Sequence, residues 1–189
     1  MSFSDSNQEM VELTDDAKKE LGKDYVKREI YRDHPTKAVA ILTFGKNRGE
    51  LWMQQRPPSG CKPLYWEIVA GSKSSEHSSI REAAEEEVTE ELFGEDLGEA
   101  PEQFDLSYLG RIYKETDNPQ ELHLFVYDSN RKSFPCSDEV HDGEFVTVKQ
   151  IPDEIKQRKV TNSTLHSLRE LGLLDKPEGN LEKLAEANL

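Results

Sequence analysis

Residues 66–94 (WEIVAGSKSSEHSSIREAAEEEVTEELFG) constrain the fold more than any other part of the chain. A strand-like run ends at Gly71, and a segment rich in good helix formers follows over residues 79–93. Ser78 or Ser79 can cap the start of that helix, and the glycine directly after it can end it. The sequence therefore predicts a strand, a glycine turn and a helix in direct succession.

The predicted helix has an apolar stripe and an acidic face. At about 100° per residue the apolar residues align, and four glutamates fall beside them on an arc of about 140°. The stripe is Ala84, Val88 and Leu92, and the glutamates are Glu86, Glu87, Glu90 and Glu91. Like charges four residues apart destabilise a helix by a few tenths of a kcal/mol per pair. A hard cation such as Mg²⁺ or Mn²⁺ would relieve this repulsion, and a solvated acidic face is the alternative.

These residues resemble the motif of the Nudix hydrolases, G-x5-E-x7-R-E-U-x-E-E-x-G-U, in which U is aliphatic. In that resemblance Glu87, Glu90 and Glu91 fall on the three helix carboxylates that bind metal. Val88 falls on the aliphatic position and Gly71 on the leading glycine. The resemblance thus implies a metal site formed by Glu87, Glu90 and Glu91, with Glu86 beside them.

The flanking segments resemble the ADP-ribose pyrophosphatase branch of that family. They are QQRPPSG (54–60) with WEIVAG (66–71), REIYRDHP (28–35) with AVAIL (38–42), and ELHLFVY (121–127). The resemblance spans roughly residues 25–172. It implies hydrolysis of an ADP-sugar such as ADP-ribose, giving AMP and a sugar phosphate, with Mg²⁺ or Mn²⁺ as the cofactor. It also implies a homodimer.

The box departs from the family pattern in four places. Gly71 lies fifteen residues before Glu86, which is one more than the pattern has. Ser78 replaces the first glutamate, although Glu76 is close enough in sequence to substitute for it. Glu86 replaces the arginine, which reverses the charge, and Phe93 replaces the later glycine. A degenerate, inactive box is therefore an alternative.

A second register of the box is open. It aligns residues 81–86 (REAAEE) with R-E-U-x-E-E, so that Arg81 restores the arginine and Glu82 becomes the first carboxylate of the helix. This register leaves Gly71 four residues too close and puts Val88 where the glycine should be. The first register is preferred because it keeps residues 66–71 nearly in frame.

The chain is strongly acidic, with a net charge of −14 over 189 residues. This charge argues against a nucleic-acid backbone or an anionic membrane surface as the partner. No hydrophobic run approaches membrane-spanning length, and the N-terminus lacks the basic and apolar regions of a signal peptide. Cys61 and Cys136 allow at most one disulfide, so a reducing cytoplasm is expected.

The predicted elements make a mixed α/β fold with a sheet between helices. Strands are expected at 37–44, 50–55, 65–70, 105–113, 121–127 and 144–149, and helices at 79–93, 151–157 and 162–171. The resemblance sharpens this to the Nudix α/β/α sandwich with a mixed sheet. The expected organisation is an N-terminal arm (1–24), one Nudix domain (25–173) and a polar tail (174–189).

Metal-assisted hydrolysis also needs a general base and groups that bind the substrate. In related pyrophosphatases the base comes from the box or from an acidic loop after the central strand. In this chain that loop offers Glu139 and Glu144. Arg56 is the preferred cation for the substrate, ahead of Arg111 and Lys114. Gly71 can present its backbone closely.

Aromatic side chains could stack on a nucleobase. By the resemblance Tyr31 and Trp52 lie in suitable regions, as does Tyr25, and packing in a core or a dimer is the alternative. The leading hypothesis is an ADP-sugar pyrophosphatase. The others are a Nudix enzyme for another nucleotide sugar or nucleotide, and a Nudix-fold binding module without catalysis.

Overall fold

Strand β3 (Thr36–Phe44) runs through the centre of the molecule in the computed structural model, which describes residues 10–27, 34–94, 103–114 and 119–175. All its residues except Lys37 are buried. A strand covered on both faces has a near-continuous apolar sequence, which explains the run AVAIL within it. β3 pairs in parallel with β8 (Gln120–Asp128) and antiparallel with two other strands.

Seven strands form the main sheet of the described residues, in the order β5-β4-β3-β8-β7, with β6 beside β3 and β9 beside β4. The other strands are β4 (Glu50–Gln55), β5 (Trp66–Glu67), β6 (Val69–Ser72), β7 (Leu106–Lys114) and β9 (Asp142–Thr147). Only the β3–β8 pair is parallel among these pairings. The predicted mixed sheet is therefore confirmed.

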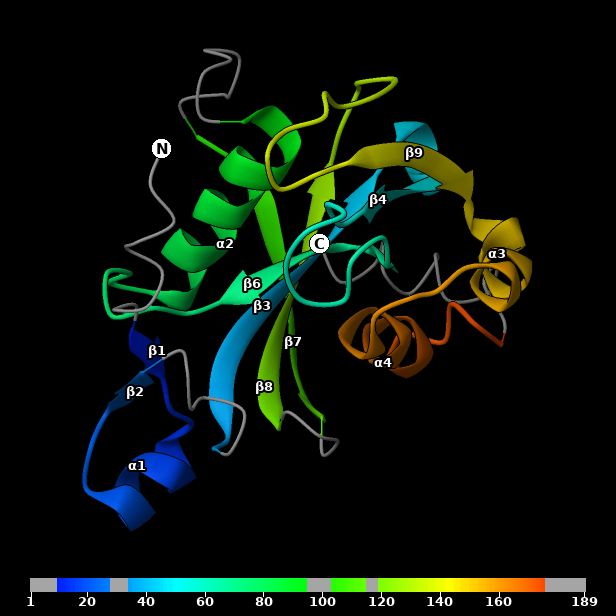
Figure 1. Ribbon diagram of the computed structural model, residues 1–189. Coiled ribbons are helices and arrows are strands. Elements are labelled where there is room, and N and C mark those ends of the chain that lie inside the picture. Colours follow the sequence, from blue (N-terminus) through cyan, green and yellow to red (C-terminus); the bar gives the residue numbers. More distant parts are fainter. Residues whose placement is uncertain (1–9, 28–33, 95–102, 115–118, 176–189) are drawn as a thin grey trace.

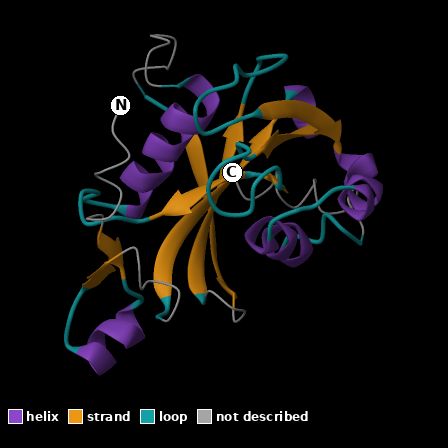
Figure 2. Ribbon diagram, in the orientation of Figure 1, coloured by secondary structure: helices purple, strands orange, loops and turns teal. Residues whose placement is uncertain are grey.

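Helices cover both faces of this sheet (Figures 1 and 2). On one side lies α2 (Ile80–Val88), which continues as a π-helical turn (Thr89–Phe93). On the other side lie α3 (Ile151–Gln157) and α4 (Asn162–Glu170), and short 3-10 turns occupy Lys46–Arg48 and Val148–Gln150. The arrangement is the predicted sandwich of helices around a sheet.

The two faces have separate cores because side chains alternate along a strand. On β3, Val39 and Ile41 pack with the stripe of α2, in which Ala84, Val88 and Leu92 are fully buried. Ala40 and Leu42 point the other way and pack with residues of α3 and α4. Any residue of the sheet can thus be assigned to the α2 face or to the α3/α4 face.

A small N-terminal unit packs beside the sheet. It consists of β1 (Met10–Glu12), α1 (Asp15–Leu21) and β2 (Tyr25–Lys27), and β1 pairs with β2 across the expected boundary at residue 24. Backbone hydrogen bonds from Glu12 N to Lys73 O (2.8 Å) and from Thr14 N to Pro35 O (2.9 Å) attach it to the sheet. The domain boundaries stay a prediction, and most of the tail, residues 176–189, lies outside the described residues.

The predicted strand 65–70 is broken in the structure. β5 pairs with β4, β6 pairs with β3, and Ile68 stands between them. The Ile68 amide donates to the Thr164 hydroxyl of α4 (3.0 Å) instead of to a strand. The strand prediction is confirmed at residues 66–67 and 69–70, and the break at Ile68 was not predicted because its partner lies 96 residues further along the chain.

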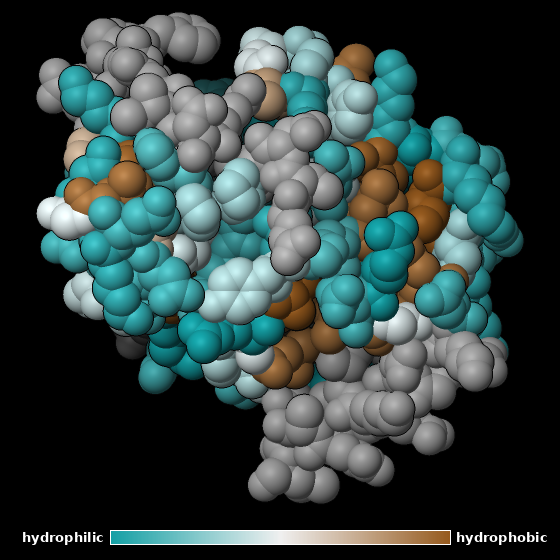
Figure 3. Space-filling view, turned by 90° about the horizontal axis from the view of Figure 1, so that it is seen from below, coloured by the Kyte–Doolittle hydropathy of each residue, from teal (hydrophilic) through white to brown (hydrophobic). Residues whose placement is uncertain are grey.

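Most described atoms on the face seen in Figure 3 are hydrophilic, and hydrophobic atoms gather in small patches. This pattern fits a chain of which 34% is hydrophobic and 33% charged. None of the described helices is long and apolar enough to cross a membrane.

Candidate functional site

The π-helical turn after α2 contacts β4 and β6 through one buried carboxylate. Glu91 is only 5% exposed. It accepts hydrogen bonds from Gln54 Nε2 (2.7 Å) and from the Ala70 amide (3.2 Å). Gln54 in turn accepts from Trp52 Nε1 (3.3 Å), so a chain of polar contacts leads from the core to Glu91.

Three further glutamates lie within electrostatic range of Glu91. Burial raises the pKa of Glu91 well above its usual range, and the nearby negative charges of Glu87, Glu67 and Glu139 raise it further. The hydrogen bond from Gln54 opposes this rise. We call Glu67, Glu87, Glu91 and Glu139 the acidic cluster. It brings together side chains from β5, from α2 with its π turn, and from the loop between β8 and β9.

Glu67 is a residue of the cluster that the sequence did not single out. It is buried, and Arg56 Nη1 donates to both of its carboxylate oxygens (2.8 and 3.0 Å). Burial raises the pKa of Glu67, and Arg56 counteracts the rise. The sequence held no signal for Glu67, because it shares the α2 face only once β5 pairs it with Gln54 of β4.

Arg56, the predicted substrate cation, therefore already has an acidic partner. It also donates from Nε to the Cys61 carbonyl (2.9 Å), which holds the loop between β4 and β5. Its side chain is one-third exposed. Arg56 thus borders the acidic cluster and keeps solvent access.

Gly71 lies directly against Glu87. A Cβ built on Gly71 would overlap the Glu87 carboxylate, so this close approach requires a glycine. Glu87 is half-buried between the strand and solvent. The glycine that aligns with the start of the motif and one of the motif's helix carboxylates are thus neighbours in space.

Glu86 points elsewhere, although it was predicted with the metal residues. It is exposed, and its carboxylate contacts His77 Nε2 in the loop between β6 and α2. The reason is the helix period, since consecutive residues are rotated by about 100°. Glu90 is half-buried on the π turn.

The residues of the alternative register are engaged at the start of α2. Ser79 is the N-cap and accepts from the Glu82 amide (3.0 Å), so of the two possible caps it is Ser79 that acts. The Glu82 carboxylate accepts from Ser78 N and Oγ, both at 2.5 Å. Arg81 binds Glu85 and the carbonyls of residues 104 and 106.

The π turn explains one departure from the family pattern. A π turn has one residue more than an α turn, and Gly94 follows it with a positive φ of 70°. Phe93, which stands at the pattern's glycine position, is instead buried and packs against Phe104 and Phe134. The glycine that ends the helix is therefore displaced by one residue.

The two candidate bases lie on different faces of the sheet. Glu139 is the exposed member of the acidic cluster, and its charge raises the pKa of Glu91. Glu144 pairs with Met53 on the α3/α4 face and binds Arg158 Nη2 (2.6 Å). As a base Glu144 was predicted from its loop position, but it belongs to β9 and alternation turns it away from the cluster.

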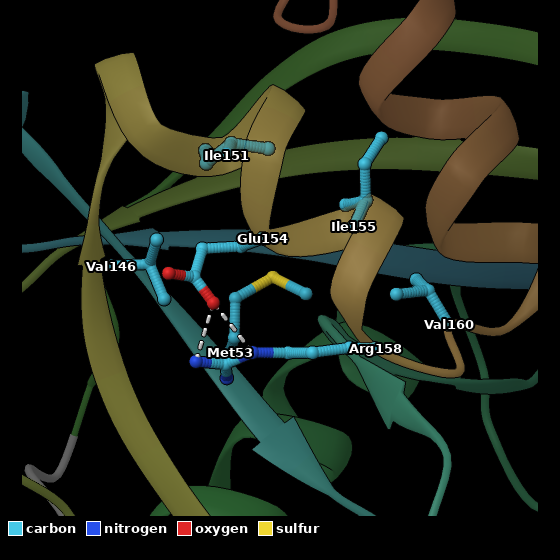
Figure 4. A pocket seen from close by; sticks show the side chains of 7 residues that line it. All are labelled: Met53, Val146, Ile151, Glu154, Ile155, Arg158 and Val160. Carbon is cyan, nitrogen blue, oxygen red and sulfur yellow. Dashed lines mark hydrogen bonds and ion pairs between the residues drawn. The ribbon is translucent and has the colours of Figure 1, made fainter.

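Arg158 holds Glu144 on the α3/α4 face through their ion pair. Arg158 Nε donates to Glu154 (2.8 Å), and the side chains of Arg158 and Glu154 lie together over Met53 (Figure 4). Arg158 also stacks over the Trp66 ring at 4.1 Å. The apolar hollow under this pair has a volume of about 10 Å³, enough for about one water molecule and far too small for a nucleotide.

The predicted aromatic and basic residues divide three ways. Trp52 is 1% exposed and packs edge-on against Phe134 and Phe145. It is therefore a core residue, which was the alternative to stacking on a nucleobase. Tyr31 lies outside the described residues, and Tyr25 belongs to β2 in the N-terminal unit. Arg111 and Lys114 lie on β7, where Arg111 binds Glu121 (3.3 Å) and Lys114 contacts Gln120 (3.5 Å).

The acidic cluster suits a divalent cation in its chemistry. Its donors are carboxylate oxygens, which Mg²⁺ and Mn²⁺ prefer. Two of the four carboxylates are buried close to like charges, a costly arrangement without a cation or a proton. Within the described ranges, no group of three or more Asp, Glu, His or Cys side chains is already drawn together around one point. The donor chemistry of these residues fits the ion.

Solved structures with the same fold were found. DR0079 from Deinococcus radiodurans is similar at a TM-score of 0.68 with 15% identity, over 86% of this chain and 98% of that chain. The Nudix domain of NrtR from Shewanella oneidensis, complexed with ADP-ribose, gives a TM-score of 0.53 with 10% identity, over 77% and 87%. A Nudix hydrolase from Alicyclobacillus acidocaldarius gives 0.54 with 12% identity, over 70% and 89%.

Sequence comparison adds nothing to these structural matches. No family model matches the chain, and neither does any curated protein sequence. At identities of 10–15% the structural similarity shows a shared fold. The chain thus has the Nudix fold predicted from its sequence, and the ADP-ribose branch stays a prediction.

Proposed function

We propose that this chain hydrolyses the diphosphate bond of a nucleoside diphosphate linked to another moiety. The observation that carries the proposal is the acidic cluster beside Gly71, in which the buried Glu91 of the box lies within electrostatic range of Glu87, Glu67 and Glu139. So many carboxylates around a buried one favour the binding of a cation. A diphosphate brings the complementary oxygen ligands.

The proposed roles rest on the surroundings of the residues and, for Glu90, on the resemblance to the family motif. Glu87, Glu90 and Glu91 would hold Mg²⁺ or Mn²⁺, and Gln54 orients Glu91 through its amide. The chemistry that the cation supplies when bound is neutralisation of phosphate charge and a lower pKa of the attacking water. Glu139 is exposed beside the cluster and is our candidate general base. Gly71 leaves room for the Glu87 carboxylate.

An ADP-sugar such as ADP-ribose is the preferred substrate. The motifs around Arg56 and Gly71 support this choice by resemblance, and a protein of the same fold, the NrtR Nudix domain, binds ADP-ribose. Arg56 is one-third exposed and can turn a donor toward a phosphate while it keeps contact with Glu67. The products would be AMP and a sugar phosphate. We also propose a cytoplasmic homodimer.

Two other functions are carried by particular observations. Another nucleotide sugar or a free nucleotide fits the same cluster equally well. A ligand-binding module without catalysis is favoured by Glu86, which replaces the family's arginine and contacts His77.

Product release from a panel of nucleotide sugars and nucleotides, with and without Mg²⁺ or Mn²⁺, tests the proposal. Beside the native protein we would assay Glu90→Gln and Glu82→Gln, two glutamates of the same helical segment. Metal-dependent turnover that is lost in Glu90→Gln and kept in Glu82→Gln supports the proposed site. The reverse result supports the alternative register, and equal tolerance of both removes the metal site from the proposal.

Binding separates the remaining functions. If the folded protein turns over no substrate under any condition, calorimetric titration with ADP-ribose shows whether the protein still binds this ligand. Binding without turnover supports the module, and the absence of both contradicts an ADP-sugar ligand.

A further inference from the structure

The loop between β6 and α2, residues 73–79, is held by side chains that the proposed chemistry does not use. It starts beside Gly71 and ends at the N-cap Ser79, so its position sets the approach of β6 to the helix. A loop of this kind must be fixed if Glu87 is to keep its place against Gly71. The contacts of His77 and Lys73 show how this is done.

His77 lies at the centre of the loop contacts, with a side chain only 9% exposed. Its Nδ1 accepts from the Ser74 amide (3.0 Å) and lies 3.1 Å from the Ser74 hydroxyl. Since an amide N–H can only donate, Nδ1 carries the lone pair and Nε2 carries the proton. The protonated Nε2 is the atom that contacts the Glu86 carboxylate.

Lys73 ties the other end of the loop to the N-terminal unit. Its Nζ donates to the His77 carbonyl (2.8 Å) and pairs with Glu12 Oε2 (2.5 Å). Lys73 is 6% exposed. The loop is therefore attached on one side to β1 and on the other to α2, and His77 takes part in both attachments.

Glu86 and Glu87 are consecutive residues with different partners. Glu87 lies against Gly71 of β6, and Glu86 contacts His77 in the loop, six residues after Gly71. One turn of α2 thus contacts both β6 and the loop that leaves it. This arrangement gives Glu86 a function that does not involve a metal.

We propose that Glu86 and His77 are a positioning pair that fixes the loop against α2, and that Glu86 is not a metal ligand. In the proposed enzyme, on which this role in the site rests, the pair keeps Gly71 and Glu87 in contact. The charge-reversed position of the box is then a substitution with a structural purpose of its own.

Amide hydrogen exchange in the metal-free protein tests the pair without any assay of activity. The reporters are the amides of Ser75, bonded to the Met10 carbonyl, and Glu76, bonded to the Ser74 hydroxyl. Glu86→Gln and His77→Ala should each speed exchange there about tenfold, the effect of losing roughly one charge-assisted hydrogen bond. The double variant should be no faster than His77→Ala alone, because both changes break the same link.

A matched control comes from the same helix. Glu85 pairs with Arg81 (2.9 Å) and does not contact the loop, so Glu85→Gln should leave exchange at both reporters unchanged. Unchanged exchange in Glu86→Gln, or an equal change in Glu85→Gln, would overturn the proposal.

Mn²⁺ titration separates positioning from ligation. A positioning pair predicts that Glu86→Gln and His77→Ala weaken Mn²⁺ binding to the same extent. Weaker binding in Glu86→Gln with native binding in His77→Ala would identify Glu86 as a ligand and sink the proposal. If the native protein binds no Mn²⁺, the proposed function fails, and the exchange experiment still decides whether the pair holds the loop.

Discussion

Glu12 and Glu91 are both buried glutamates, yet their environments shift their pKa values in opposite directions. Burial raises the pKa of Glu12, but hydrogen bonds from Lys18, Lys73 and Lys37 overcome this and lower it to about 2. Glu91 is surrounded by other carboxylates, and burial raises its pKa well above its usual range. The first environment stabilises a charge on folding, whereas the second leaves a charge for a ligand to neutralise.

This contrast separates a structural part of the molecule from a chemically poised one. Around Glu12, the three lysines are supplied by α1, β3 and the loop after β6, so the ion pairs connect three parts of the chain. Near Glu91, the cation Arg56 is already paired with Glu67. Variants of the two glutamates should therefore affect different measurements.

Glu91→Gln should give the largest effect on catalysis. It removes a proposed ligand while glutamine keeps the shape of the site, so we expect kcat/KM to fall on the order of 10²-fold or more. The free energy of unfolding should stay the same or rise, because a repelled buried carboxylate is lost. Metal-dependent product release and urea unfolding measure the two effects, and a strongly destabilised variant would break the contrast.

Glu12→Gln should do the opposite. Removing the shared partner of three lysines leaves buried positive charge, which costs 3–5 kcal/mol in a fully buried pair. Because Lys18 is 24% exposed and Lys37 14%, screening reduces the expected loss to about 2 kcal/mol. Urea unfolding measures it, with Asp16→Asn as the control, since the Asp16–Lys19 pair is almost fully exposed. Native stability in Glu12→Gln would contradict a structural role for these ion pairs.

The two environments should also give opposite pH dependence. The stabilisation from Glu12 is complete above the ordinary value of 4.5 and is lost as the pH falls through about 2. The stability associated with Glu91 is complete below 4.5 and is lost as the pH rises through its raised pKa.

The free energy of unfolding of the Glu12→Gln and Glu91→Gln variants, measured across pH 2–8, tests whether the two pH dependences are opposite. As the pH falls below 4.5, Glu12→Gln should lose less stability than the native protein does. As the pH rises above 4.5, Glu91→Gln should lose less stability than the native protein does. Added Mn²⁺ should stabilise the native protein increasingly as the pH rises, because it binds the ionised carboxylate. Parallel pH curves for the native protein and the Glu91→Gln variant would argue against a perturbed Glu91.

Gly71→Ala should have only a small effect on stability. The new methyl group meets only the end of the flexible Glu87 side chain, which can turn away, so we expect a loss below about 1 kcal/mol. The displaced carboxylate should weaken Mn²⁺ binding several-fold. Glu87→Asp in the same background shortens the side chain and should recover part of the binding, whereas native affinity in Gly71→Ala would show that Glu87 is not needed there.

The parts of the fold that depend on local pattern were predictable. The apolar run of β3 and the stripe of α2 with its π turn specify which faces are buried, and both are buried in the structure. The break at Ile68 was not predictable, because it depends on Thr164 of a distant helix. Side-chain direction at Glu144 depends on the register of β9 with β4, which the sequence of the loop does not contain.

The site was predictable in outline for the same reason. Spacing along the helix brings Glu87 and Glu91 toward one face, and the structure has both in the acidic cluster. Glu67 was missed because its contribution arises only when β5 pairs with β4. The direction of Glu86 toward His77 depends on the path of a loop, which spacing does not specify.

The π turn at Thr89–Phe93 has a consequence for how such proteins diverge. A wide turn absorbs an inserted residue within the helix. Glu87 before the turn and Glu90 and Glu91 within it keep the spacing of the pattern, while the closing glycine is displaced by one position. A search that requires a fixed interval between the glutamates and the closing glycine would pass over such a chain. Insertions hidden in helices can therefore separate relatives in sequence long before their folds differ.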